Sequence, residues 1–330
     1  MSVEVLSPGL FTTIQDLGRY GSQQFGVIVS GAMDSYSLRI ANLLVGNREG
    51  EGALEITLVG PKLQFEHDQL IAITGGDLHA TIDGKAAPLW RPLLIRKGSI
   101  LQFKSAVKGC RAYVAFAGGI AVPEVMGSKS TYVRAGIGGY QGRALQKKDR
   151  FVCGETGEIG QSFVHQLEQA KHHFSWSVND GLIDFRQTQS IRILRGSEFD
   201  RFDEQSRQQL FQLPYTLTTS ADRMGYRLEG PALSLAEKFE LLSEGVTYGT
   251  IQVPSSGKPI ILMADRQTTG GYPKIGQVIS ADLPSLAQLQ PTASIHFKEV
   301  TLEQAECELL NKERIIHEIK MSIHLKARFL

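Results

Sequence analysis

Residues 70–84 read LIAITGGDLHATIDG, and this stretch indicates the fold class of the chain. The stretch begins with a mainly apolar run at 70–74, and Gly75 and Gly76 come directly after this run. A second apolar-patterned run ends at Asp83 and Gly84, a pair that favours the tight turn of a β-hairpin. Further short apolar runs occupy 93–95, 100–103 and 112–117. Many short strands at this spacing favour a barrel or sandwich over a parallel α/β sheet, so we expect a mainly β chain with a few helices.

Helical patterns are few. Residues 34–45 carry apolar side chains at helical spacing, and Asp34 is placed to cap the start of that helix. Residues 199–213 are a second candidate. A third helix is predicted to begin at Thr301, which has the spacing of a capping box with Gln304.

Short echoes relate the two halves of the chain. Residues 16–20 resemble 222–227, and 99–103 resemble 294–297, which fits either a duplicated β domain or chance. The polar stretch 154–180 marks the region of a linker. We therefore expect an N-terminal domain at 1–165, a linker at 166–189, a C-terminal domain at 190–300 and a helical tail at 301–330.

Composition argues against several classes of protein. The 330 residues are 42% hydrophobic and 21% charged, and the net charge of +1 gives no field that attracts nucleic acid or a membrane surface. The 3 cysteines form no C-x-x-C pair and the 8 histidines show no ligand spacing, so we expect no metal site. No signal pattern opens the chain, and no apolar run approaches the ~20 residues that span a bilayer, so we expect a cytoplasmic protein.

The stretch richest in chemical groups follows an apolar run at 259–263. Asp265 and Arg266 stand at the end of this expected strand. Hydroxyl, glycine and further donor residues come next, namely Thr268, Thr269, Gly270, Gly271, Tyr272 and Lys274. Such donors suit an oxyanion or a phosphate group, because glycine lets the backbone approach closely. The alternative is a Gly-Gly hairpin turn with exposed polar residues, but the convergence of different donors favours a functional site.

Two loops near the N-terminus also carry charged side chains. Residues 9–19 end in Asp16 and Arg19, which suit bidentate binding of a planar substrate or, alternatively, a structural clamp that braces a turn. Residues 29–35 run into the first expected helix. Asp34 is there a cap or a base, and a plain cap is favoured.

A fourth candidate is the stretch 220–227. It combines one carboxylate with two guanidinium groups and a phenol, at Asp222, Arg223, Arg227 and Tyr226. These groups fit an acidic substrate, and equally fit a role in knitting two domains together.

Taken together, these stretches resemble one family, the C subunit of 5-oxoprolinase, also called KipA or allophanate hydrolase subunit 2, which is a biotin-dependent carboxyltransferase-like family. The matching segments are 9–19, 26–34, 53–57, 60–61, 118–120, 127–131, 222–231 and 249–276. The resemblance runs to about Phe297, and residues 301–330 lie outside it. Three residues depart from the pattern: Ile28 stands where many members have proline, and Lys148 and Thr292 stand where many have glycine, which indicates varied turns.

The resemblance implies two cyclophilin-like β-barrel domains and two partners, a KipI-like B subunit and a LamB/YcsF-like A subunit. The complex of the three opens 5-oxoproline to L-glutamate with ATP as co-substrate. Two alternatives stay open. One is a regulatory binding protein that antagonises a KipI-type kinase inhibitor, and the other is a carboxyltransferase component that acts on urea-like amides.

Opening a lactam with ATP needs donors for developing negative charge and a base near the attacking water. On this basis the predicted catalytic residues are Asp16, Asp222 and Arg266. The predicted substrate- or anion-binding residues are Arg19, Asp34, Arg223, Tyr226, Arg227, Thr268, Thr269, Gly270, Gly271, Tyr272 and Lys274.

Overall fold

The fold is described from a computed structural model, in which the described residues are 2–169, 174–237, 239 and 241–329. The chain forms two compact units. The first contains Met1–Arg19, Ser30–Ile183 and Glu313–Leu330, and the second contains Tyr20–Val29 and Asp184–Lys312. The chain thus passes between units inside the expected linker 166–189, of which 170–173 lie outside the described residues.

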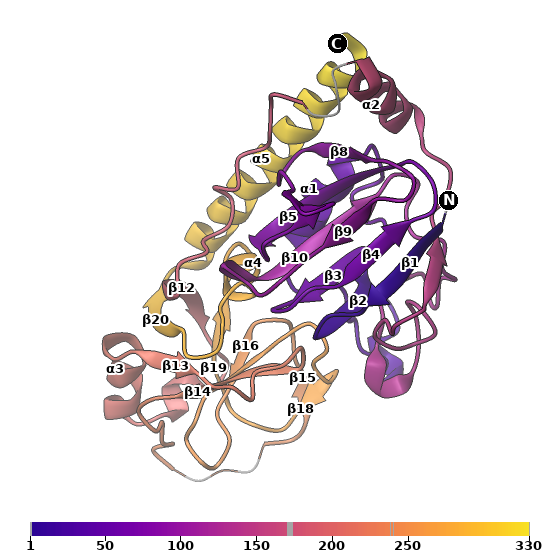
Figure 1. Cartoon of the computed structure of the whole chain (residues 1–330). Coiled ribbons are helices and arrows are strands. Elements are labelled where there is room, and N and C mark those ends of the chain that lie inside the picture. The colour runs from indigo at the N-terminus through magenta and orange to yellow at the C-terminus, as the bar shows by residue number, and fades with distance from the viewer. Residues whose placement is uncertain (1, 170–173, 238, 240, 330) are drawn as a thin grey trace. The chain divides into compact units, whose positions relative to one another are not determined.

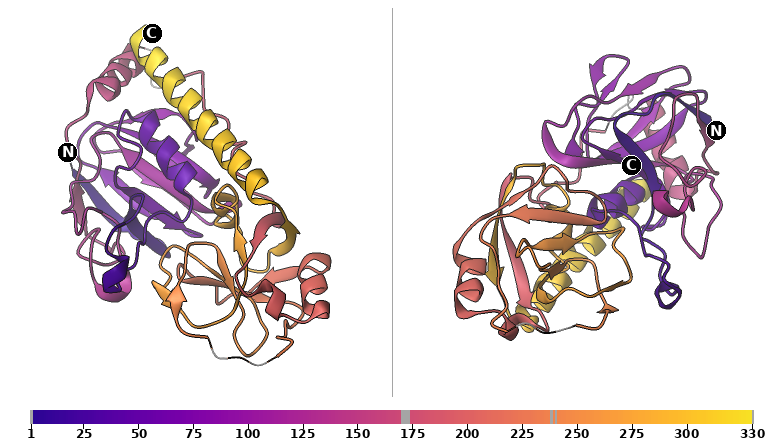
Figure 2. Two further views of the ribbon diagram at one scale, coloured as in Figure 1. Left: turned by 180° about the vertical axis from the view of Figure 1, so that it is seen from behind. Right: turned by 90° about the horizontal axis from the view of Figure 1, so that it is seen from below.

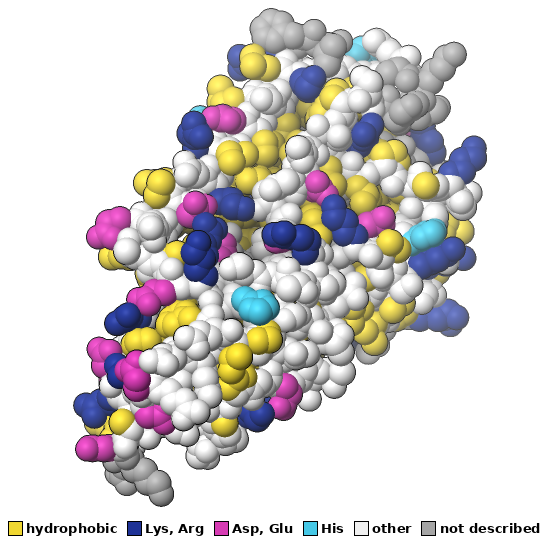
Figure 3. Space-filling model, turned by 90° about the vertical axis from the view of Figure 1, so that its left-hand side faces the viewer, with side chains coloured by type: hydrophobic (Ala, Val, Ile, Leu, Met, Phe, Trp, Pro, Cys, Tyr) yellow, Lys and Arg dark blue, Asp and Glu magenta, His cyan; other side chains and the backbone are white. Residues whose placement is uncertain are grey.

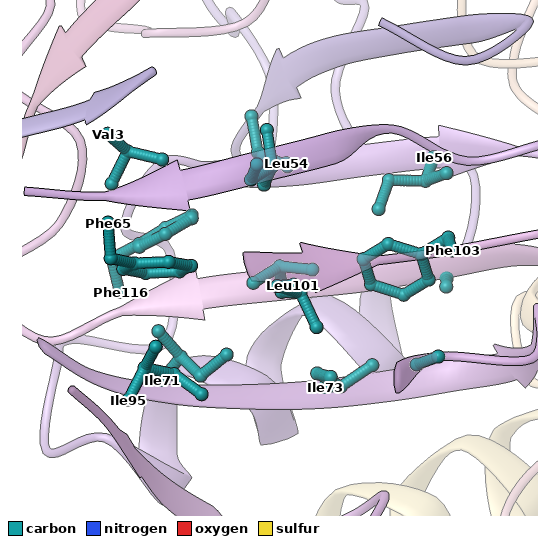
Figure 4. Packing of buried hydrophobic residues seen from close by; sticks show 14 of the residues in the cluster. Val3, Leu54, Ile56, Phe65, Ile71, Ile73, Ile95, Leu101, Phe103 and Phe116 are labelled. Atoms are coloured by element: carbon teal, nitrogen blue, oxygen red, sulfur yellow. The ribbon is translucent and has the colours of Figure 1, made fainter. Parts of the chain in front are cut away.

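The first unit is built on two antiparallel sheets, and Figure 1 labels most of their strands. The strand orders are β11-β1-β4-β9-β6-β7 and β2-β3-β10-β5-β8. Side chains from both sheets form one hydrophobic core, in which Val3, Leu54, Phe65 and Phe116 are nearly inaccessible to solvent (Figure 4). The strands are β1 (Ser2–Ser7), β2 (Phe11–Gln15), β3 (Ala53–Thr57), β4 (Lys62–Phe65), β5 (Gln69–Asp77), β6 (Thr81–Ile82), β7 (Lys85–Ala86), β8 (Pro92–Ile95), β9 (Ile100–Gln102), β10 (Lys108–Phe116) and β11 (Arg150–Val152).

The stretch 70–84 forms strands, as the sequence predicts. Asp83 and Gly84 have φ of 49° and 81°, which is the left-handed backbone of a tight turn, and they join the antiparallel pair β6 and β7. The predicted hairpin is therefore confirmed. Strand β5 does not end before Gly75, where φ is +80° and the register with β10 shifts, so this glycine marks an irregularity inside the strand.

The second unit is a closed barrel with the strand order β12-β19-β16-β17-β14-β13-β20. Strands β12 and β20 are parallel and close it. A short ribbon of β15 and β18 carries part of the 265–272 loop. The strands are β12 (Thr188–Arg195), β13 (Tyr215–Leu217), β14 (Gly225–Glu229), β15 (Glu244–Gly245), β16 (Thr250–Gln252), β17 (Ile260–Leu262), β18 (Thr269–Gly270), β19 (Lys274–Val278) and β20 (Ser294–Glu299). The prediction of a mainly β chain is confirmed, and among the described residues the closed barrel is found in this unit.

Helix α1 (Ser35–Leu44) packs on β5 and β10. The carboxylate of Asp34 accepts hydrogen bonds from the Ser37 amide at 2.9 Å and from its hydroxyl at 2.6 Å, which confirms Asp34 as the cap. The expected helix 199–213 is divided into η3 (Phe199–Arg201) and α3 (Glu204–Gln212), because Asp203 caps a new helix start. The other short helices are η1 (Gln23–Phe25), η2 (Val133–Ala135) and α4 (Leu283–Leu286).

Helix α2 (Glu158–Gln169) was not predicted, since its sequence is mostly polar. It forms because Phe163 and Leu167 lie four residues apart on one face, and both are fully buried. Amphipathic spacing in a polar stretch therefore makes a helix where the sequence suggested a linker.

Helix α5 (Leu302–Phe329) is one long helix in both views of Figure 2. Its predicted capping box is confirmed, because the Gln304 side chain accepts from the Thr301 amide at 3.0 Å and the Gln304 amide donates to the Thr301 hydroxyl at 3.3 Å. In the first unit, Arg39 of α1 pairs with Glu313 of α5 at 2.7 Å and with Glu49 at 2.8 Å. The hydroxyl of Ser162 on α2 donates to a carbonyl in the last turn of α5 at 2.6 Å.

Positive and negative side chains are interspersed on the face shown in Figure 3. Several charged side chains of the described residues are ion-paired, such as Arg195 with Glu299 at 2.6 Å. No helix among the described residues has an apolar stretch long enough to cross a bilayer.

Candidate functional site

The predicted site residues divide between the two units. Asp16, Arg19 and Asp34 belong to the first, and the remaining predicted residues belong to the second. The geometry of each group decides which side chains are available to a ligand.

Asp16 is the centre of a saturated hydrogen-bond network. It follows β2, is 7% exposed, and its Oδ1 accepts from the Gly18 amide at 2.7 Å and from the Ser128 and Ser130 hydroxyls at 2.8 and 2.5 Å. Its Oδ2 accepts from the Lys129 amide at 2.6 Å. Four donors thus hold this carboxylate, which favours the bracing role over proton transfer.

Arg19 has a similar setting. It is fully buried, its Nε donates to the Val125 carbonyl at 2.8 Å, and its Nη2 donates to the Ser130 carbonyl at 2.9 Å. Asp16 and Arg19 therefore both fasten the 125–130 segment to β2. This arrangement disfavours Arg19 as a receptor for a substrate carboxylate.

Asp34 adjoins a buried network as well as capping α1. Its amide donates to the Tyr113 hydroxyl oxygen at 2.8 Å, and that hydroxyl donates to Glu55 at 2.7 Å. Burial, together with the charges of Glu55 and Asp34, raises the pKa of Tyr113 well above its usual value. These contacts support the cap role that the sequence favours.

In the second unit, Asp265 follows β17 as expected. It forms a two-point ion pair with Arg223, in which Nε and Nη2 each lie 2.9 Å from a carboxylate oxygen, and both residues are buried. The pair bridges the predicted stretches 220–227 and 265–272. Because the charge of Arg223 is matched by Asp265, this arginine is a weak candidate for a substrate anion.

The other members of the 222–227 stretch diverge. Asp222 is exposed, and its Oδ1 accepts from the Met224 and Gly225 amides at 2.8 and 3.1 Å in a turn. Tyr226 and Arg227 alternate along β14. The tyrosine is buried with its hydroxyl 3.5 Å from the Ala287 carbonyl, while the arginine is exposed on the opposite face of the strand. The stretch therefore does not gather its polar groups at one point.

Lys274, at the start of β19, is enclosed by two carboxylates. Its Nζ lies 2.5 Å from Glu244 of β15 and 3.5 Å from Glu198, which also accepts from the Lys274 amide at 2.9 Å. Burial alone would lower the pKa of Lys274, but the two glutamates raise it above the usual lysine value. Two negative charges for one positive charge argue against Lys274 as an anion receptor.

Arg266 differs from its neighbours. It is half-buried, its Nε is 3.4 Å from the Val246 carbonyl, and its guanidinium lies 6.0 Å from the centre of the Tyr248 ring. Burial lowers the pKa of this guanidinium, opposed by the nearby Tyr20, Tyr248 and Asp265. Arginine still remains charged at neutral pH, so a positive charge is held on the loop.

The rest of the loop forms the ribbon of β15 and β18 and a surface cavity. Gly270 lies against Gln252, where an added Cβ would come within 2.4 Å of the amide nitrogen. Thr268 and Thr269, which carry hydroxyls, stand between Arg266 and that glycine in the sequence. Gly271 and Tyr272 border an open cavity of about 770 Å³ in the second unit, lined largely by apolar residues and serines.

Four residues that shape this loop were not predicted from the sequence. Glu198 and Glu244 neutralise Lys274, and Gln277 fixes the segment that carries Tyr248. The run 249–254 matches the family pattern, and Tyr248 directly precedes it, so the sequence held a signal for this residue. Nothing in the local sequence shows that a distant glutamate faces Lys274. Among the described residues, no group of three histidine, cysteine, aspartate or glutamate side chains is arranged to hold a metal ion.

Comparison with known proteins gives a family match. Residues 25–299 match the family model described as carboxyltransferase domain, subdomain A and B. The chain is 40% identical to the 5-oxoprolinase C subunit of Escherichia coli over 323 residues, which cover 98% of this chain and 99% of that protein. It is 39% identical to the protein of the same name from Haemophilus influenzae over 303 residues, which cover 92% of this chain and 93% of that protein.

Longer proteins contain a similar region. The urea amidolyase of Saccharomyces cerevisiae is 31% identical over 92% of this chain, but the match spans 17% of that protein. A crystal structure of the Kluyveromyces lactis urea amidolyase matches with a TM-score of 0.86 and 30% identity, covering 96% of this chain and 20% of that chain. The similarity to the Escherichia coli protein covers nearly the whole chain and so includes most of the tail 301–330. The family model, in contrast, ends at residue 299, close to the limit near Phe297 that the sequence resemblance predicts.

Proposed function

The chain belongs to the carboxyltransferase domain family of subdomains A and B, together with the 5-oxoprolinase C subunits, and on this premise we propose that it is the C subunit of an ATP-dependent 5-oxoprolinase. One observation carries the proposal. The match with the Escherichia coli protein covers nearly all of both chains, whereas the match with urea amidolyase covers 17% of that protein. The separate 5-oxoprolinase subunit is therefore the better parallel.

The proposed reaction opens the lactam of 5-oxoproline to give L-glutamate. Resonance makes the lactam carbonyl a poor electrophile, and ATP supplies the phosphoryl group that activates it. A bound triphosphate needs several cations or a metal ion around it. Of the cations on the 265–274 stretch or bonded to it, Arg223 is paired with Asp265 and Lys274 lies between two glutamates, so this stretch does not fit a triphosphate. We therefore assign it to the amide substrate rather than to a phosphate group.

The remaining predicted groups have distinct proposed roles. Arg266 binds an anionic group, and the hydroxyls of Thr268 and Thr269 are donors on the same loop. Asp222 is exposed, and its Oδ1 accepts from the Met224 and Gly225 amides of a turn. We propose that its other oxygen, Oδ2, takes part in proton transfer. We propose that Asp16 instead holds the 128–130 segment in place.

The partners are also part of the proposal. Since relatives of this length are named as subunits, the chain is proposed to act with a KipI-like B subunit and a LamB/YcsF-like A subunit. The reaction is then completed by the complex, with ATP as its co-substrate.

The test combines the three purified subunits and measures glutamate release from 5-oxoproline with and without ATP. We expect ATP-dependent release that disappears when this chain is omitted. Replacing Arg266 with alanine should abolish most of that release, whereas Arg195→Ala, which removes an exposed arginine paired with Glu299, should not. An assembled complex that releases no glutamate would refute the proposal.

A second candidate is carboxyl transfer to a urea-like amide. It is favoured by the family model and by the structural match to urea amidolyase. The two functions separate in one assay, since carboxyl transfer needs carboxylated biotin and consumes no ATP at this chain. Carboxylation of urea by the purified chain given carboxybiotin would support this alternative.

A further inference from the structure

The charges on the 265–274 stretch are unevenly matched. Three cations lie on it or bond directly to it: Arg223, Arg266 and Lys274. Arg223 shares two hydrogen bonds with Asp265, and Lys274 faces Glu198 and Glu244. Arg266 forms no ion pair with any carboxylate of the described residues. The stretch therefore holds one positive charge that no neighbouring carboxylate pairs.

The surroundings of Arg266 suit a planar anion. Its Nε donates to the Val246 carbonyl at 3.4 Å, which is a long hydrogen bond, and its two terminal nitrogens donate to no residue that the structure describes. The ring of Tyr248, 6.0 Å away, provides a wall beside the guanidinium. Partial burial strengthens any ion pair made there, because less water screens it. A planar guanidinium fork matches the two oxygens of a carboxylate.

The wall beside Arg266 is held firmly in place. The Gln277 side chain donates to the Tyr248 carbonyl at 2.7 Å and accepts from the Thr247 and Thr250 hydroxyls, each at 2.9 Å. Gly249 has φ of +87°, and an added Cβ there would come within 2.9 Å of the Gln277 amide nitrogen. The Tyr248 segment is thus pre-organised by its own neighbours before any ligand arrives.

We propose that Arg266 is the receptor for a single planar carboxylate, with Tyr248 as the wall of that subsite and Gln277 as a positioning residue. The inference rests on the proposed function, in which the ligand is the carboxylate of 5-oxoproline. One uncompensated positive charge matches one carboxylate, whereas a nucleotide triphosphate would leave several negative charges unmatched. The subsite would also separate 5-oxoproline from urea-like amides, which have no carboxylate to bind.

The first test does not depend on turnover. Phenylglyoxal modifies arginine side chains, and mass spectrometry of the peptides obtained by digesting the labelled chain reports the rate at Arg266. We expect Arg266 to react faster than the paired Arg223, and saturating 5-oxoproline to slow the reaction at Arg266 about tenfold, as occupancy of about 90% requires. The neutral lactam 2-pyrrolidinone should give no protection, and ATP at equal ionic strength should give none.

The same labelling on the assembled complex covers the case in which partner subunits complete the subsite. Protection by ATP but not by 5-oxoproline would overturn the inference, and so would the absence of protection by 5-oxoproline in both the chain and the complex. The labelling rate at the exposed Arg195 is the matched control, and it should stay the same when any of these ligands is added.

Kinetics of the complex provide the second test. Arg266→Lys keeps the charge but loses the fork, so KM for 5-oxoproline should rise about 10- to 100-fold while KM for ATP is unchanged. Gln277→Ala should raise the same KM with little change in kcat. Gln277→Glu should raise it as well, because a carboxylate still accepts from the Thr247 and Thr250 hydroxyls but cannot donate to the Tyr248 carbonyl. A rise in KM for ATP alone would overturn the assignment. If the complex opens no lactam at all, the proposed function fails, while the labelling result still decides whether Arg266 binds a carboxylate.

Discussion

Replacing Asp16 with alanine tests whether this residue braces the fold or takes part in catalysis. The carboxylate is 7% exposed and accepts from four donors, two of which are the backbone amides of Gly18 and Lys129. The hydroxyls of Ser128 and Ser130 can rotate to other acceptors, but the two amides cannot. Each of these partly buried amides costs at most about 1–3 kcal/mol when it is left without a partner, so Asp16→Ala should lower the free energy of unfolding of the first unit by up to about 2–6 kcal/mol.

Asparagine gives a graded version of the same change. Asp16→Asn keeps one oxygen as an acceptor but places an amide nitrogen opposite a donor. One of the two backbone amides then stays unsatisfied, and the loss should be about 1–3 kcal/mol. The loss of stability in Asp16→Ala should therefore be about twice that in Asp16→Asn, because two backbone amides lose their acceptor in the first variant and one in the second.

The assay is urea unfolding followed by tryptophan fluorescence. Both tryptophans, Trp90 and Trp176, belong to the first unit, so the signal reports the unit that contains Asp16. A loss of about 4 kcal/mol should lower the midpoint of that transition by about 1–2 M urea, for a slope of roughly 2–3 kcal/mol per molar. Asp222→Ala is the matched control, because Asp222 is exposed and lies in the second unit, and it should leave the midpoint unchanged.

The reasoning would be refuted by either of two results. Asp16→Ala could unfold at the wild-type midpoint, which would show that the network contributes little. Alternatively, Asp16→Asn could keep that midpoint while the assembled complex loses nearly all turnover, which would return Asp16 to a role in proton transfer.

Three further predictions concern the anchoring of α5 and one strained turn. Glu49→Gln removes a partner from both Arg39 and Lys320, and because these groups are partly exposed we expect a loss of about 1 kcal/mol or less, seen as faster amide exchange in the C-terminal half of α5. Burial raises the pKa of Glu49, but Lys320 and Arg39 lower it below the usual glutamate value, so its stabilisation is full above that usual value and is lost as the pH falls through the lower folded-state pKa. Protection factors in α5, which divide out the intrinsic pH dependence of exchange, should therefore fall on acidification in the wild type and less in Glu49→Gln. Thr292 has φ of 74°, which is strained for a β-branched residue, so Thr292→Gly should raise thermal stability by about 1 kcal/mol.

Much of the fold could be predicted because its signals are local. The Asp83-Gly84 turn, the Asp34 cap and the Thr301 capping box each depend on residues within four positions of one another, and each is present in the structure. The departures from the family pattern at Lys148 and Thr292 were also informative. Both have φ of 74°, a conformation that glycine adopts without strain.

The features that could not be predicted depend on tertiary partners. Helix α2 exists because its apolar face finds a surface to cover, which a mostly polar composition conceals. The same holds for residues 20–29, which belong to the second unit although they are adjacent in sequence to strands of the first. Sequence order alone gives no sign of such an exchange between units.

The 265–274 stretch shows why an inventory of residue types overstates a site. By type, Arg223, Arg266 and Lys274 are equivalent donors for an anion. Their partners make them different, because Asp265 matches the first and Glu198 and Glu244 outnumber the charge of the last. The quantity that selects a ligand at each position is the charge left after local pairing, which is one guanidinium at Arg266 and one excess carboxylate beside Lys274. Of three cations that are equivalent by residue type, Arg266 is therefore the one left as a receptor for a carboxylate among the described residues.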